Sequence, residues 1–151
     1  MSERLNYNLA APDGMKALDA TYAYIRGCGL PAVLIDLVYL RVSQINGCAY
    51  CIDLHTRDLQ RHGVATGKLM LISAWQEAGA LFSARERAAL AWAETVTRVE
   101  ATGIPDAAHA EVAEHFEGKA LADLTIAISL MNAYNRLAIG FRRVPGAAAE
   151  A

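Results

Sequence analysis

The stretch that does most to decide the fold is Ile45-Asn46-Gly47-Cys48-Ala49-Tyr50-Cys51-Ile52-Asp53-Leu54-His55. Asn46-Gly47 is a turn signal, so we expect one helix to end there and a second helix to begin at once. Apolar residues recur with a period near 3.6 on both sides of this turn and along almost the whole chain, with no strand pattern bounded by hairpin turns. The sequence therefore predicts an all-α fold.

Glycine and proline residues divide the chain into seven predicted helices, at residues 14–26, 32–45, 48–62, 67–78, 84–101, 106–116 and 120–141. Ser83 and Glu86 have the spacing of a capping box at the start of the fifth helix, and Pro105 suits the first turn of the sixth. No repeat or linker interrupts these segments, and we expect residues 147–151 to fray. We predict one domain over residues 1–151, with about six to seven helices.

The composition excludes several classes of protein. The 151 residues are enough for one domain with a sizeable core. With 54% hydrophobic residues, 20% charged residues and a net charge of -2, the chain is neither disordered nor suited to bind nucleic acid. No apolar run reaches the roughly 18 residues that span a bilayer, and the N-terminal residues lack the layout of a signal peptide. We expect a cytoplasmic protein that binds neither nucleic acid nor membrane.

The predicted helices at residues 32–45 and 120–141 are apolar over most of their circumference. A helix that is apolar on all sides must be buried. The interior of a bundle of this size is too small to bury two such helices completely. We therefore expect part of their surface to lie between subunits of a homo-oligomer.

Cys48, Cys51 and His55 lie near the start of the predicted helix 48–62. At 100° per residue, their side chains fall within an arc of about 60° on one helix face. The first turn of a helix offers free backbone N–H groups and the positive end of the dipole, and both favour a thiolate. His55 can take the thiol proton or stabilise the resulting anion. The spacing indicates an activated cysteine with a second thiol within reach.

Such a pair is typical of a two-step peroxidase, in which one thiolate attacks the O–O bond and its neighbour then closes a disulfide that a dithiol reductant reopens. A thioredoxin-like fold would need a βαβ pattern, and covalent haem attachment would need a His directly after the second cysteine, where Ile52 stands. A structural or sensory metal site remains an alternative, with a ligand set of Cys48, Cys51, His55 and one of Asp36, His62 or Cys28.

Asp36 is the only residue between Leu30 and Leu40 whose side chain is ordinarily charged at neutral pH, and it lies in the most apolar predicted helix. Burying its carboxylate costs on the order of several kcal/mol unless it has a partner. His55 on the next helix is one candidate, because a carboxylate that orients an imidazole beside a thiol completes a proton relay. An equally open alternative is a structural ion pair with Arg41, Arg57 or Arg136.

The segment from Leu37 to Cys51, continued through His55 to Gly63, resembles the AhpD-like members of the carboxymuconolactone decarboxylase family. The family pattern places a Glu twelve residues before Cys-x-x-Cys, and a His after three further residues. Cys48, Cys51 and His55 fit this pattern, and Asp36 stands at the Glu position.

The resemblance implies an AhpD-like bundle that assembles as trimers or hexamers and reduces alkyl hydroperoxides through a Cys48–Cys51 disulfide. Cys51 would attack the peroxide, Cys48 would resolve the product, and His55 with Asp36 would relay the proton. We expect no cofactor and no metal, and an unidentified dithiol or protein as reductant. Since Asp36 is one methylene shorter than Glu, and Tyr50 replaces a second histidine of the founding member, the relay is expected to be shorter or bridged by water.

The decarboxylases that name the family lack the cysteine pair, so a lyase that retains the fold is a second alternative. Outside the motif, Cys28 between two glycines is expected to be a buried small residue rather than a third redox centre. Asn132, Asn135 and Arg136 interrupt the apolar last helix and are expected to hydrogen-bond between helices or subunits.

Overall fold

The computed structural model describes residues 2–146, and the regular secondary structure within them is entirely helical. Its longer helices are α2 (Pro12–Gly27), α3 (Ala32–Asn46), α4 (Ala49–Arg61), α6 (Ala84–Thr97), α8 (Asp106–Ala113) and α9 (Lys119–Phe141). Shorter helices are α1 (Tyr7–Ala10), α5 (Thr66–Met70) and α7 (Val99–Thr102), with 3-10 turns at Ile72–Glu77 and Gly79–Leu81. The predicted all-α class is confirmed for these residues, whereas the tail at 147–151 lies outside them. No helix in the described range is long and apolar enough to cross a membrane.

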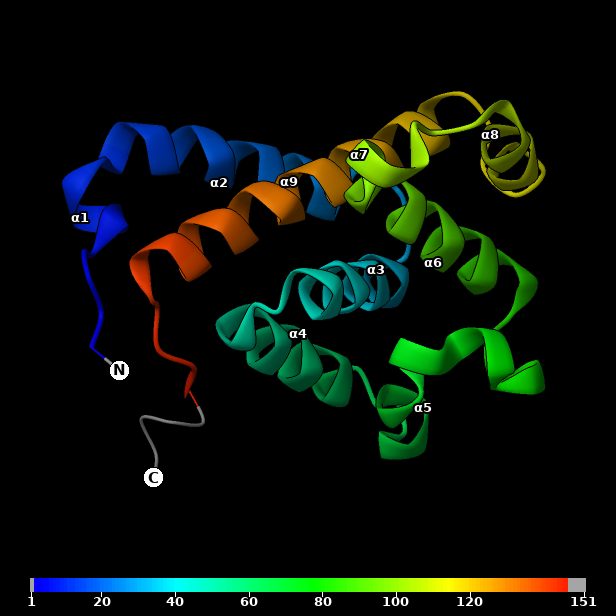
Figure 1. Cartoon of the computed structure of the whole chain (residues 1–151), viewed down its shortest axis with the longest axis horizontal. Coiled ribbons are helices and arrows are strands. Elements are labelled where there is room, and N and C mark those ends of the chain that lie inside the picture. Colours follow the sequence, from blue (N-terminus) through cyan, green and yellow to red (C-terminus); the bar gives the residue numbers. More distant parts are fainter. Residues whose placement is uncertain (1, 147–151) are drawn as a thin grey trace.

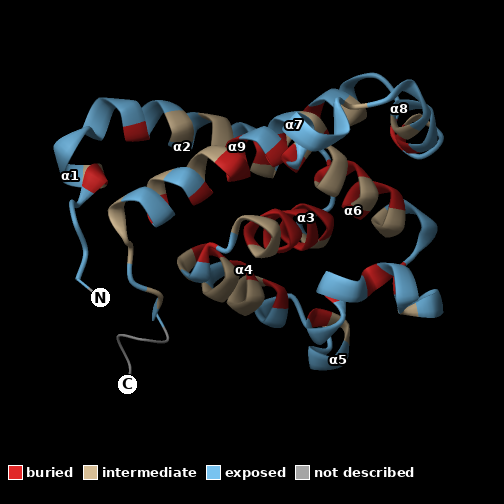
Figure 2. Cartoon of the chain, in the orientation of Figure 1, coloured by how far each residue is buried: buried red, intermediate tan, exposed pale blue. Residues whose placement is uncertain are grey.

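Helix α3 forms the centre of the bundle. Figure 1 shows α2 and α9 running side by side along one edge, with α4 on the other side of α3 and α6 beside it. Every residue from Leu34 to Ser43 is buried, and Figure 2 shows α3 almost entirely in the colour of buried residues. Because the middle of α3 is covered within one chain, only its two ends remain for the surface expected between subunits. The rest of that surface is left to α9, where Ile126 and Ile139 are exposed.

Several predicted helix boundaries are wrong, each for a local reason. Helix α2 begins at Pro12 rather than residue 14, because proline suits the first helical position, where an N–H group has no partner. The predicted helix 67–78 is split, since the chain leaves α5 after Met70 and Ala74 has non-helical dihedral angles. The predicted helix 84–101 ends at Thr97, where Arg98 leaves the helical region before α7. The capping box at Ser83 is confirmed.

The turn between α3 and α4 sets the position of the motif. Gly47 has φ 70° and ψ 31°, a left-handed conformation that glycine adopts without steric cost. The N–H groups of Gly47 and Cys48 close the end of α3 by bonding to the carbonyls of Gln44 and Ser43, respectively. The predicted break at Asn46-Gly47 is therefore confirmed, and α4 returns along α3 immediately after it.

Candidate active site

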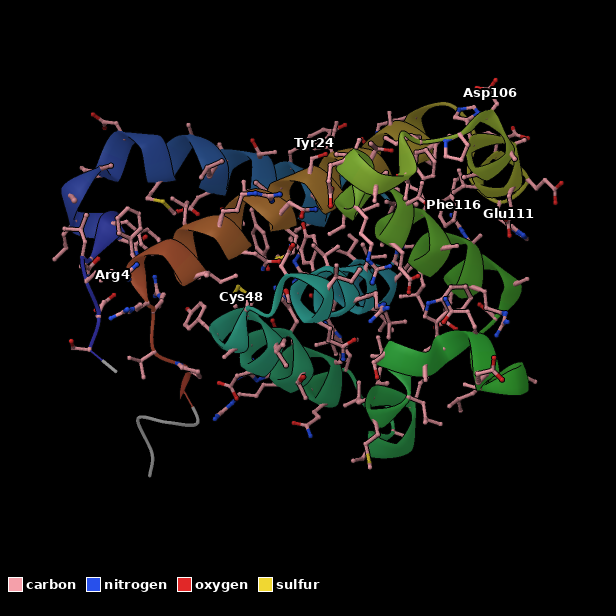
Figure 3. The ribbon with its side chains drawn as sticks, in the orientation of Figure 1. Arg4, Tyr24, Cys48, Asp106, Glu111 and Phe116 are labelled. Carbon is pink, nitrogen blue, oxygen red and sulfur yellow. A yellow bond between two sulfur atoms is a disulfide. The ribbon has the colours of Figure 1, made fainter. Side chains whose placement is uncertain are left out.

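Cys48 and Cys51 lie where the chain enters α4, and Figure 3 shows Cys48 at this junction. Cys48 is the N-cap residue, with an extended backbone, and its Sγ accepts the N–H of Cys51 at 3.3 Å. The sequence placed Cys48 within the first helical turn, but it precedes that turn because an N-cap side chain bonds to the N–H group three residues later. The two cysteines are joined in a disulfide, with their Cα atoms 5.4 Å apart.

The surroundings of the two sulfurs differ. Both cysteines are buried, with exposed fractions of 1% for Cys48 and 3% for Cys51. Cys51 lines a cavity of about 610 Å³, and Cys48 is not among the lining residues of that cavity. Cys51 is therefore the sulfur that a molecule in the cavity reaches first.

His55 lies one helical turn after Cys51 and lines the same cavity. Its Nδ1 atom is 3.3 Å from Oδ1 of Asp36 and 3.7 Å from Oδ2 of Asp58. Neither contact has the alignment of a hydrogen bond in this arrangement, so Nδ1 is held at ion-pair distance only. The imidazole also packs against the ring of Tyr39 on α3, with centroids 5.0 Å apart. Contacts with α3 thus position the imidazole beside Cys51.

Asp36 has no exposed surface, but several nitrogen atoms of neighbouring side chains surround its carboxylate. Arg26 donates hydrogen bonds to its two carboxylate oxygens, at 3.1 and 2.7 Å. Burial raises the pKa of the Asp36 carboxyl, but His55 and Arg26 together outweigh burial and bring this pKa below its ordinary value. His62, at the end of α4, places Nε2 3.6 Å from the second oxygen. Asp36 is therefore a carboxylate at neutral pH.

The arginines that the sequence offered as partners of Asp36 are occupied elsewhere. Arg41 pairs with Glu94, Arg57 pairs with Asp53, and Arg136 donates to Asn132. The prediction of an arginine partner named the wrong residues, because helical spacing alone does not show which helices meet. The sequence offered two roles for Asp36, as the partner of His55 or as half of an ion pair with an arginine. In the structure its carboxylate has both contacts, one with Arg26 and one with His55.

Arg26 is the site residue that sequence reasoning missed. It lies in the last turn of α2, ten residues before Asp36, and the turn at Gly27-Cys28-Gly29 brings the two together. Its guanidinium also donates to the hydroxyl of Tyr22, from Nε at 3.0 Å and from Nη2 at 2.7 Å. The sequence offered one signal for this pair. Arg26 is a basic residue at the end of one predicted helix, and the next predicted helix contains the buried Asp36, which needs a partner.

The cavity beside Cys51 has a mostly aromatic and apolar lining with a few charged groups. Its volume lies within the range of about 300–1,000 Å³ that is usual for small-molecule sites. Its lining consists of Tyr7, Asn8, Pro12, Met15, Lys16, Asp19, Tyr22, Tyr50, Cys51, Leu54, His55, Met131, Tyr134, Ala138 and Arg143. Helices α1, α2, α4 and α9 all contribute to it, so the site depends on how these helices pack.

The ligand set predicted for a metal does not form in the described part of the chain. The group there that could hold an ion consists of Asp36, His55 and Asp58, whose ligand atoms lie within 4.8 Å of one another, and it includes no cysteine. Arg26 already occupies both oxygens of Asp36. A cation at this position would lie beside the guanidinium and share the oxygens of Asp36 with it, so charge repulsion disfavours a metal there.

Two further expectations concern residues outside the cavity. Asn132 and Asn135 both accept hydrogen bonds from Asn46, at 2.9 Å, so they connect α9 to the end of α3 as predicted for bonding between helices. Cys28, the residue directly after α2, was expected to be buried but is only half-buried, because it packs at the edge of the core.

Comparison with known proteins places these features among relatives. The sequence profile described as the carboxymuconolactone decarboxylase family matches residues 12–95. The uncharacterized protein YdfG of Bacillus subtilis is 34% identical over 139 residues, which are 92% of this chain and 94% of YdfG.

Two solved structures share the fold. ATU0492 from Agrobacterium tumefaciens, a protein of unknown function described provisionally as the antioxidant defence protein AhpD, superposes with a TM-score of 0.91 at 37% identity. That match covers 95% of this chain and 98% of ATU0492. An uncharacterized peroxidase-related protein from Silicibacter sp. TM1040 has a TM-score of 0.78 at 22% identity, covering 90% of this chain and 72% of that one.

Proposed function

This chain belongs to the carboxymuconolactone decarboxylase family, and we propose that it is a thiol peroxidase that reduces organic hydroperoxides through Cys48 and Cys51. Its all-helical fold is AhpD-like. The observation that carries the proposal is that Cys51 and His55 line one cavity, while Cys48 is close enough to Cys51 to form a disulfide. A fold alone does not define a reaction, so the proposal depends on this arrangement of side chains.

The reaction needs two steps at sulfur. The Cys51 thiolate attacks the distal oxygen of the hydroperoxide, the O–O bond breaks, and the leaving alkoxide takes a proton to become an alcohol. Cys51 is then a sulfenic acid, and the Cys48 thiolate attacks its sulfur, so that a disulfide forms and hydroxide leaves as water after protonation. A dithiol reductant, itself oxidised to a disulfide, restores both thiols.

The assignment of Cys51 as the attacking residue rests on access and position. Cys51 faces the cavity, whereas Cys48 is behind it at the N-cap. In the reduced protein, the positive end of the α4 dipole favours a thiolate at either cysteine. The N–H group of Cys51 bonds to Sγ of Cys48, so the assignment depends on the cavity and on His55, one turn after Cys51. Cys48, within disulfide reach, is then the resolving residue.

We propose that His55 accepts the proton of the Cys51 thiol and that Asp36 stabilises the resulting imidazolium. Because Nδ1 of His55 faces Asp36, its Nε2 atom is left to exchange a proton with the thiol or with the leaving alkoxide. Oδ1 of Asp36 lies 3.3 Å from Nδ1 of His55, although its side chain is one methylene shorter than the Glu of the family pattern. The proposed relay therefore needs the imidazole to turn into hydrogen-bond alignment with Asp36 during the reaction. Tyr50, at the position of the founding member's second histidine, lines the cavity beside Cys51.

Thiol counting tests this function. Protein reduced with dithiothreitol and desalted contains three thiols per chain, and one equivalent of cumene hydroperoxide is expected to remove the two of Cys48 and Cys51 and to leave Cys28. Metal analysis is done on protein purified without chelator, before dithiothreitol is added. Stoichiometric zinc together with thiols that do not react would overturn the proposal in favour of a metal site. The Cys51→Ser variant serves as the control, because it should consume no peroxide.

A further inference from the structure

A guanidinium group forms part of the cavity wall close to the proposed nucleophile. Arg143 follows the end of α9, and its guanidinium carbon lies over the ring of Tyr50 at 4.5 Å and over the ring of Tyr7 at 5.5 Å. Its Nη1 atom donates to the hydroxyl of Tyr7 at 3.2 Å. Two aromatic rings therefore hold this cation in place, and one of them belongs to the residue directly before Cys51.

The charge of Arg143 has no carboxylate partner among residues 2–146. No Asp or Glu oxygen in that range lies within 4.0 Å of it, and Glu3 acts on it only from farther away. The charged side chains of the lining besides His55 are Arg143, Lys16 and Asp19, so cations outnumber carboxylates. Asp19 accepts a hydrogen bond from Tyr134 at 2.8 Å. The cavity thus has a net positive lining with one fixed cation.

Apolar side chains make up much of the remaining lining. Met15, Leu54, Met131 and Ala138 line the same space together with the tyrosine rings. An apolar cavity with one oriented cation is complementary to a molecule that has a hydrocarbon body and a single negative group. A neutral alkyl hydroperoxide would leave the guanidinium without a ligand.

We propose that the cavity selects hydroperoxides of carboxylic acids, such as those of fatty acids, and that Arg143 binds the carboxylate while the hydrocarbon chain lies on the apolar wall. The hydroperoxide group then lies at Cys51. The hydroperoxide part of this inference rests on the proposed function, but recognition of the carboxylate does not. Arg143 is accordingly a specificity residue, and the thiol chemistry does not require it.

Kinetics with a matched pair of substrates test the inference. The 13-hydroperoxide of linoleic acid and its methyl ester differ only in charge at the carboxyl end, and both are used below their aggregation concentration. We expect a KM at least about tenfold lower for the acid, which is about 1.4 kcal/mol, since only the acid offers a carboxylate to the guanidinium of Arg143. Arg143→Gln is expected to remove this preference by raising the KM of the acid alone, with kcat unchanged.

Two further variants separate charge from packing. Arg143→Lys keeps the cation and should retain most of the preference for the acid. Arg142→Gln removes the neighbouring arginine, which does not line the cavity, and should behave as the unmodified protein. Equal KM values for acid and ester in the unmodified protein, or an Arg143→Gln variant that weakens both substrates equally, would overturn the inference.

A binding measurement keeps the test independent of turnover. Titration calorimetry with dodecanoate and methyl dodecanoate on the Cys51→Ser variant, with and without Arg143→Gln, needs no redox chemistry. We expect dodecanoate to bind more tightly than the ester, by about tenfold, and only when Arg143 is present. If no hydroperoxide is reduced but this preference is found, the peroxidase proposal fails and the carboxylate site stands. Equal binding of the two ligands contradicts the site itself.

Discussion

Both terminal nitrogens of Arg26 donate hydrogen bonds to the two carboxylate oxygens of Asp36, which lies wholly inside the protein. An arginine is always charged in proteins, so the carboxylate is compensated whether or not His55 carries a proton. The imidazole is therefore free to gain and lose a proton during a reaction without leaving a buried charge unpaired. This pairing explains how an aspartate is tolerated in the most apolar helix of the chain.

Removing Arg26 should destabilise the protein. In Arg26→Gln the buried carboxylate keeps only His55 and His62 nearby, and we expect a loss of about 2–3 kcal/mol, below the usual cost of breaking a buried pair because the Arg26 side chain is 26% exposed. Urea unfolding measures this loss. Arg61→Gln is the control, since its side chain is 69% exposed, and its ion pair with Asp58 should be worth less than about 1 kcal/mol. Equal losses in the two variants would contradict the role of Arg26.

Replacing Asp36 should slow the chemistry of Cys51. Asp36→Asn removes the negative charge beside His55, so the imidazolium that supports the thiolate is less stable, and the alkylation profile of reduced Cys51 should move by about one pH unit to higher pH. Iodoacetamide kinetics across pH give the profile. Asp36→Glu should retain activity, at a cost of roughly 1–3 kcal/mol for the added methylene. If Asp36→Asn folds and its alkylation profile coincides with that of the unmodified protein, Asp36 is not part of the relay, which then consists of Cys51 and His55 alone.

The same carboxylate predicts how stability depends on pH. Because the pKa of Asp36 is lower in the folded protein than in the unfolded chain, its ionic contacts stabilise the fold above the unfolded value of about 3.9. This contribution is lost as the pH falls through the lowered pKa. Unfolding free energies of the unmodified protein and Asp36→Asn should therefore differ most at neutral pH and converge in acid. A difference that stays constant from pH 7 into acid would argue against a charged Asp36.

The two cysteines should give different products when they are replaced singly. Cys51→Ser should abolish peroxide consumption, because the sulfur that faces the cavity is gone. Cys48→Ser should allow one turnover and leave a sulfenic acid on Cys51, because only the resolving step is lost. Dimedone labelling followed by mass spectrometry locates the acid. Preserved turnover in Cys51→Ser, with the label on Cys48, would reverse the two assignments.

Association of several copies remains a prediction of the resemblance and of the apolar surface of α9. With Ile126 and Ile139 exposed on that helix, we expect the protein to form at least a trimer. Size-exclusion chromatography with light scattering measures the mass directly. A stable monomer at micromolar concentration would be incompatible with this expectation.

The sequence by itself determined the features that depend on near neighbours along the chain. Helical periodicity, the glycine turn at Gly47 and the capping box at Ser83 all act within a few residues, so they could be read without knowing the packing. The spacing of Cys48, Cys51 and His55 likewise follows from one helix. The apolar surroundings of Asp36 showed that it needs a partner, since an unpaired buried charge is too costly to persist.

Only the tertiary structure decided which partners meet. Arg26 reaches Asp36 because α2 and α3 are joined by one particular turn, and no periodicity within either helix encodes that angle. Arg143 reaches Tyr7 because the end of α9 meets the N-terminal segment, where Arg4 bonds to the carbonyls of Phe141 and Gly140. The contacts of Arg143 and Arg4 join residues more than a hundred positions apart. Their geometry, like that of the Arg26–Asp36 pair, is set by the burial of the whole apolar surface of the bundle rather than by any local pattern.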